Sequence, residues 1–156
     1  LFNHAMAKAL LFFVAGNLSQ RYGTTQMSRI RNAVRAMPLT GTLLLLATFA
    51  ITGVPPFAIF VTEFGIVGAG FAQGNVIVAV VLVAALAIVF AGAFGHALDM
   101  AFSKPRLRLA PVLLGPLGTI ALVSPAVFVV LFGVYMPPAV SQAVQQVAAI
   151  FGRGSL

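Results

Sequence analysis

Lys8 and His4 are the residues of this sequence whose types and spacing most directly suggest chemistry. They lie in the apolar stretch LFNHAMAKALLFFVAGNL, with Asn3 beside them. A separation of four residues places both side chains on one face of a helix. A free imidazole has a pKa of about 6.5, and desolvation lowers the pKa of an amine. The two groups therefore form a plausible proton-transfer pair. The structural alternative is that Lys8 extends its amine to a membrane interface or pairs with a carboxylate elsewhere.

Glu63 is one of only two acidic residues in the chain, and it follows a backbone break. The segment GVPPFAIFVTEF contains the break, which consists of Gly53, Pro55 and Pro56. Broken helices at membrane depth are tolerated inside protein or beside a water-holding cavity, where a carboxylate can be hydrated and change protonation. Glu63 is therefore a candidate proton carrier. The alternative places it at a lipid headgroup, with no role beyond solvation.

His96 and Asp99 form a second candidate group near the end of a long apolar stretch. Their separation of three residues places them on one helical face, just before a basic loop, where they could act as an exit relay for protons. A purely structural Asp–His pair, or an ion pair between Asp99 and Lys104, is the alternative. Two histidines and two carboxylates spread over several helices are too few for a metal site.

The composition is that of an integral membrane protein. Of 156 residues, 61% are hydrophobic and only 7% are charged, which is too little polar surface for a soluble domain of this size. The formal charge of +7 comes mainly from two basic loops between apolar stretches, where basic residues suit lipid headgroups and orient helices better than they suit nucleic acid. One loop contains Arg21, Arg29, Arg31 and Arg35, and the other contains Lys104, Arg106 and Arg108. There is no cysteine, which excludes disulfides and thiolate metal sites.

The apolar stretches predict an all-α fold in which helices position these residues. The expected membrane segments are 1–18, 39–53, 56–71, 75–100 and 112–136, followed by an amphipathic helix at 139–151 that lies on the membrane or packs as a terminal helix. The two short segments around the prolines form either one interrupted helix or two short helices. If they cross the membrane once, both basic loops face one side, which the positive-inside rule makes cytoplasmic. If they cross twice, that rule gives no clear orientation.

The stretches HAMAKALLFFVAGNLSQRYGT and MPLTGTLLLLATFAITGVPPFAIFVTEF resemble the antiporter-like membrane subunits of respiratory complex I, of sodium/proton antiporters and of group 4 nickel–iron hydrogenases. The end, LFGVYMPPAVSQAVQQVAAIFG, looks most like component F of the hydrogenase-4 type. The resemblance implies five transmembrane segments, including the broken helix. It also implies that the chain is the C-terminal part of a longer protein, in which Lys8 and His4 pass protons to Glu63.

The same resemblance implies a non-catalytic, proton-translocating subunit of a redox-driven complex in a prokaryotic plasma membrane. Its partners would be other membrane subunits and peripheral hydrogenase or dehydrogenase subunits. It would itself hold no cofactor, because the family places nickel, iron–sulfur clusters, flavin and quinone in those partners. Two alternatives stay open: a subunit of a sodium/proton antiporter, and a membrane anchor that does not transport ions.

Overall fold

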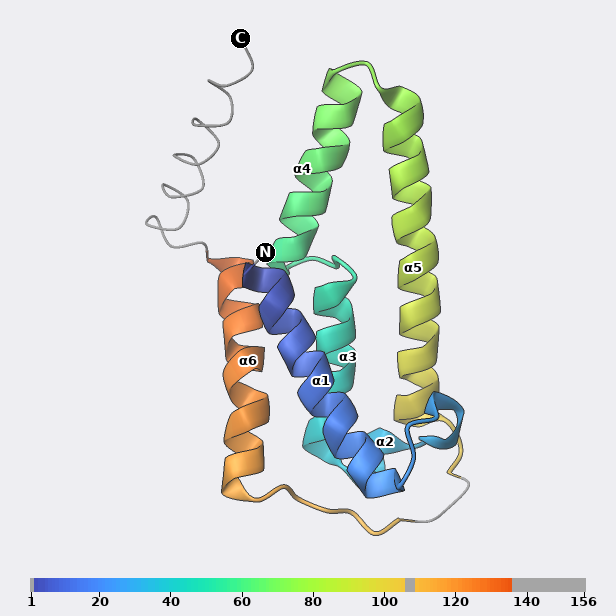
Figure 1. Cartoon of the computed structure of the whole chain (residues 1–156), viewed down its shortest axis with the longest axis vertical. Helices are drawn as coiled ribbons and strands as arrows, with labels where there is room; N and C mark the ends of the chain where they lie inside the picture. Colours follow the sequence, from blue (N-terminus) through green and yellow to red (C-terminus); the bar gives the residue numbers. More distant parts are fainter. Residues whose placement is uncertain (1, 106–108, 136–156) are drawn as a thin grey trace.

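The computed structural model describes residues 2–105 and 109–135, and within these ranges every regular element is helical (Figure 1). The elements are α1 (Phe2–Tyr22), the 3₁₀ turn η1 (Met27–Arg29), α2 (Ala33–Ala36), α3 (Pro38–Ile51), α4 (Ala58–Ala72), α5 (Val76–Phe102) and α6 (Pro116–Val134). The predicted all-α fold is confirmed for the described residues. The predicted amphipathic helix at 139–151 lies outside them.

Two helices of the described ranges, α5 and α6, are long and apolar enough to cross a membrane alone. Helices α3 and α4 are also apolar but have only 14 and 15 residues. The expected count of five membrane segments therefore stays a prediction.

Helices α3 and α4 run in the same direction, one beyond the other (Figure 1). Their 29 residues (14 + 15) compare with the 27 residues of α5, which returns to the end where α3 begins. At 1.5 Å per residue, both paths are about 40 Å long. Together α3 and α4 therefore traverse the molecule once, which favours the interrupted-helix alternative.

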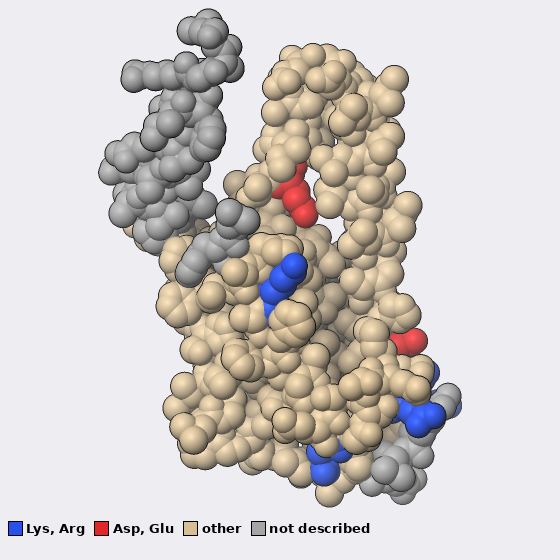
Figure 2. Space-filling model, viewed as in Figure 1, with Lys and Arg blue, Asp and Glu red and all other residues tan. Residues whose placement is uncertain are grey.

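The described residues of the two basic loops lie close together at one end of the molecule. The Arg21 guanidinium donates a hydrogen bond to the Ala110 carbonyl at 2.7 Å, and the Val112 N–H donates to the Ala36 carbonyl at 3.0 Å. In Figure 2 the Lys and Arg atoms gather at this end, apart from one patch on α1. Both basic loops are expected at one end if α3 and α4 together cross the membrane once.

The break between α3 and α4 begins with a glycine in the left-handed region. Gly53 has φ +68°, and the Val54 N–H donates to the Phe49 carbonyl at 3.1 Å, which is the wrapping hydrogen bond of a Schellman helix end. Pro55 and Pro56 follow, and α4 starts at Ala58. The chain thus stops one helix and starts the next within six residues.

The core lies in the half of the molecule formed by α1, α3, α6 and the C-terminal part of α5. Leu10, Val14 and Leu18, spaced four residues apart on α1, are wholly buried and pack in one cluster with leucines of α3 and with Leu122 of α6. Among the described residues, the other half contains chiefly α4 and the start of α5, which the turn at residues 73–75 joins (Figure 1). Glu63, in the second turn of α4, therefore lies outside this core.

Gly41 sets how closely α3 approaches α2. A Cβ added there would lie 2.6 Å from the Cα of Val34, a backbone atom that cannot move away alone. We predict that Gly41→Ala destabilises the fold by about 1–3 kcal/mol, the usual cost of overpacking. Unfolding in detergent would measure this. Gly16→Ala in α1 is the matched control, because its Cβ meets nothing within 4 Å and should be neutral or stabilising.

Candidate functional site

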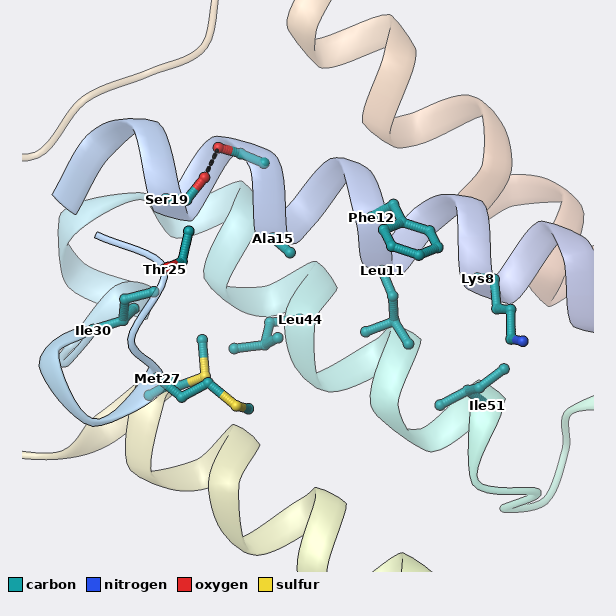
Figure 3. Close-up of a pocket in the computed structure, with 12 residues that line it drawn as sticks. Lys8, Leu11, Phe12, Ala15, Ser19, Thr25, Met27, Ile30, Leu44 and Ile51 are labelled. Carbon is teal, nitrogen blue, oxygen red and sulfur yellow. Dashed lines mark hydrogen bonds between the residues drawn. The ribbon is translucent and has the colours of Figure 1, made fainter. Parts of the chain in front are cut away.

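Lys8 is exposed on α1 and lines a groove of about 690 Å³ between α1, η1 and α3. The close-up in Figure 3 shows its side chain directed toward Ile51, the last residue of α3. Lys8 is the only ionisable residue among those lining the groove, which is otherwise mostly apolar. The C-terminal end of a helix carries partial negative charge, so this end of α3 attracts the ammonium group.

His4 and Lys8 share a face of α1, as their spacing predicts, and His4 is also exposed. Within the described residues no hydrogen bond joins the two side chains. Asn3 lines a different space, a cavity of about 10 Å³ beside Ala7 and Phe57. Lys8 and His4 therefore lie on the same face of α1, but their side chains are not hydrogen-bonded to each other in the described structure.

Glu63 lies in α4 directly over the break. Its carboxylate occupies the space in which a Cβ of Gly53 would stand, so a side chain at Gly53 would collide with Oε2. Glu63 and Gly53 line a cavity of about 420 Å³ between the break, α4 and α5, with Thr52 and aromatic rings including Phe90. Figure 2 shows an acidic patch on α4 at the edge of the opening between α4 and α5. Among the described residues the carboxylate has no hydrogen-bond or ion-pair partner.

Lys8 and Glu63 both lie at the C-terminal end of α3 but in separate cavities. The groove of Lys8 is lined by Ile51, and the cavity of Glu63 by Thr52 and Gly53, the next two residues of the chain. Glu63 contacts the break from the α4 side, whereas Lys8 approaches α3 from α1. The break is thus the element that brings the two ionisable residues to one region.

His96 and Asp99 lie elsewhere, near the C-terminal end of α5. Both are exposed, and Asp99 accepts a hydrogen bond from the Ser103 hydroxyl at 3.1 Å. No ion pair between Asp99 and Lys104 occurs in the part of the chain that the structure describes. The two residues face outward at the end that carries the basic loops, so their role as an exit relay stays a prediction.

Gly133 is a residue of the site that the sequence did not single out. A Cβ there would lie 2.8 Å from the Pro56 carbonyl oxygen and 3.0 Å from the Cα of Phe57. Helix α6 therefore packs against the break itself, backbone to backbone. The only signal in the sequence is a glycine in an apolar helix, which many membrane helices contain.

Residues 1–90 match the model of the family described as NADH:quinone oxidoreductase/Mrp antiporter, transmembrane. The chain is 28% identical over 154 residues to a Na(+)/H(+) antiporter subunit of Bacillus subtilis, a match that covers 93% of the chain and 30% of that relative. It is also 28% identical over 143 residues to the hydrogenase-4 component F homolog of Methylacidiphilum infernorum, covering 88% of the chain and 28% of the relative.

A third relative is hydrogenase-4 component B of Escherichia coli, 36% identical over 64 residues, or 41% of the chain and 10% of the relative. The chain thus spans less than a third of the length of these curated relatives.

Proposed function

Because the chain belongs to the NADH:quinone oxidoreductase/Mrp antiporter transmembrane family, we propose that it forms part of a proton-translocating membrane subunit. The subunit would work in the plasma membrane of a prokaryote, together with other membrane subunits and with peripheral redox subunits. Relatives that cover most of the chain carry the names of an antiporter subunit and of a hydrogenase-4 component, so the family includes both kinds of assembly.

The observation that carries the proposal is the placement of Glu63 at the break. A carboxylate that has no partner among the described residues, beside a cavity of about 420 Å³ and next to interrupted helix backbone, can be hydrated and can exchange protons with water. In a membrane, an ionisable residue at such a position has a functional role by default.

Lys8 is the proposed second carrier. It lies in the apolar stretch of α1 and reaches toward the end of α3 whose next residues line the cavity of Glu63. In the proposed mechanism each residue holds a proton in turn, and the charge on one changes the proton affinity of the other. His4, on the same face of α1, supplies protons to Lys8.

The position of the basic loops supports one orientation of the protein in the membrane. With α3 and α4 crossing once, the basic end would face the cytoplasm by the positive-inside rule. The α4–α5 turn at residues 73–75 would then face the opposite side.

The test is substrate-driven proton uptake by inverted vesicles that contain the whole native assembly. We predict that Glu63→Gln lowers uptake by about tenfold or more, because the amide cannot carry a proton through the cavity. Glu63→Asp keeps an ionisable group and should retain most of the transport. Assembly and electron transfer are measured in each variant. Equal uptake by Glu63→Gln and the wild type would remove Glu63 from the pathway.

A sodium/proton antiporter is the second candidate function, and the antiporter relative from Bacillus subtilis, which matches 93% of the chain, favours it. The same vesicles distinguish the two. Proton movement that depends on sodium and needs no redox substrate would assign the chain to an antiporter. Proton uptake that requires electron transfer would assign it to a redox-driven complex.

A further inference from the structure

A cavity of about 280 Å³ lies between the first turns of α3 and α6, away from Lys8 and Glu63. Leu39 and Thr40 line it from α3, Thr119 lines it from α6, and Val112 and Leu114 line it from the segment that leads into α6. The cavity belongs to the end of the molecule that carries the basic loops.

Both helices begin at this cavity without a side-chain cap. Met37 at the start of α3 and Gly115 at the start of α6 make no capping hydrogen bond. The first N–H groups of a helix have no partner within the helix, and they carry partial positive charge. Two helix starts that meet at one cavity therefore offer several unpaired donors to an anion.

Thr40 provides an independent sign of a missing partner. Its side chain is wholly buried, and its hydroxyl has no hydrogen-bond partner in the described structure. By contrast, the hydroxyl of Thr48 in α3 and that of Thr52, directly after the helix, donate to the carbonyls four residues earlier, at 2.8 and 2.7 Å. A buried hydroxyl without a partner is rare in proteins, and Thr40 lines the cavity.

The cavity wall is held in place by hydrogen bonds, and the positively charged Arg21 lies at the same end of the fold. The Arg21 guanidinium donates to the Ala110 carbonyl, and the Val112 N–H donates to the Ala36 carbonyl, so the cavity wall is held to α1 and α2. The Nε of Arg21 is also buried without a partner. Arg21 is not among the described residues that line the cavity, but its positive charge beside the segment that forms the wall favours an anion over a cation.

We propose that this cavity binds the phosphate group of an anionic phospholipid. The phosphate would accept hydrogen bonds from the Thr40 hydroxyl and from free N–H groups in the first turns of α3 and α6, after the prolines that begin the two helices and have no N–H. Leu113, which also lines the cavity, and Leu117, in the first turn of α6, are each 84% exposed and provide apolar surface for the acyl chains. Inorganic phosphate shares the headgroup chemistry but gains nothing from this apolar surface.

The experiment uses the native assembly, purified in detergent and depleted of lipid. Its thermal unfolding is followed while phosphatidylglycerol, phosphatidylcholine or inorganic phosphate is added. We expect phosphatidylglycerol to raise the unfolding temperature at lower concentrations than the other two. Thr40→Val should weaken the apparent affinity about tenfold, the loss of one hydrogen bond to a charged group. Thr42→Val, at an exposed position of the same helix, should leave the affinity unchanged.

Gly115→Asp is a second variant, which does not depend on Thr40. Gly115 has φ −64°, and a Cβ there meets nothing within 4 Å, so a side chain is accommodated. The new carboxylate would cap α6 and take the place of the phosphate, so unfolding should no longer respond to phosphatidylglycerol. An unchanged response in Gly115→Asp, or equal losses in the Thr40 and Thr42 variants, would overturn the site.

If inorganic phosphate raised the unfolding temperature as strongly as phosphatidylglycerol, the bound phosphate group would not need to come from a lipid, and that part of the proposal would be wrong. These outcomes are separate from those of the Glu63 experiment, because the cavity does not include the proposed proton carriers.

Discussion

Lys8→Met is expected to reduce substrate-driven proton uptake by about tenfold or more while leaving the assembly intact. Methionine is one atom shorter and keeps an unbranched apolar side chain, but it removes the only ionisable group among the described residues that line the groove. In the described structure Lys8 is exposed and has no ion-pair partner, so its loss leaves no opposite charge unpaired. The measurement is uptake by inverted vesicles, normalised to the amount of assembled complex.

Lys104→Met is the matched control, because Lys8 and Lys104 are the only lysines of the chain. Lys104 is exposed in the basic loop after α5, so its variant should transport like the wild type. Lys8→Arg should keep the charge but transport poorly, since guanidinium does not release a proton at physiological pH. Normal uptake by Lys8→Met would show that protons do not pass through the groove.

Local sequence signals predicted the helices and the break, because the physics that determines them is local. Pro38 begins α3 as expected of a proline in a first turn, and Gly53 adopts the left-handed conformation that ends it. The predicted bounds of the five apolar segments differ from the observed helices by a few residues. The largest differences are four residues each: α1 continues to Tyr22, beyond the predicted end at residue 18, and α6 begins at Pro116 rather than at residue 112.

Long-range arrangement was not predictable from these signals. Whether the two segments around the prolines cross once or twice depends on how α3 and α4 pack on α1, α5 and α6. The hydrogen bond from Arg21 to the Ala110 carbonyl joins residues 89 positions apart and places both basic loops at one end. Neither the periodicity nor the composition of the sequence predicts a contact between residues so far apart.

The sequence indicated which residues could form the candidate site, but not how they are arranged in space. Spacing on one helix correctly placed His4 and Lys8 on a common face. The contact of Glu63 with Gly53 depends on the path of the chain between α3 and α4, and no sequence pattern specifies that path. The close approach of Gly133 to the break was missed for the same reason, since it joins α6 to a segment more than 70 residues earlier.

Gly133→Val is expected to disturb the break and, through it, Glu63. The first added atom alone would lie 2.8 Å from the Pro56 carbonyl oxygen and 3.0 Å from the Cα of Phe57, both of them backbone atoms. Relief therefore requires α6 to move away from the break, at a cost of about 1–3 kcal/mol. Because α4 begins directly after this contact, its first turns, including Glu63, would move relative to Gly53.

We therefore predict lower stability together with lower proton uptake for Gly133→Val, and a smaller effect of the same kind for Gly133→Ala. Gly118→Ala is the control in the same helix, because its Cβ meets only the Leu114 side chain, at 3.6 Å. Unfolding in detergent measures the first effect, and uptake per assembled complex measures the second. If Gly133→Val loses stability but transports at the wild-type rate per complex, α6 supports the fold without positioning Glu63. If it loses uptake per complex, the packing of α6 on the break is part of the transport machinery, because the position of the carboxylate then depends on a helix that it does not belong to.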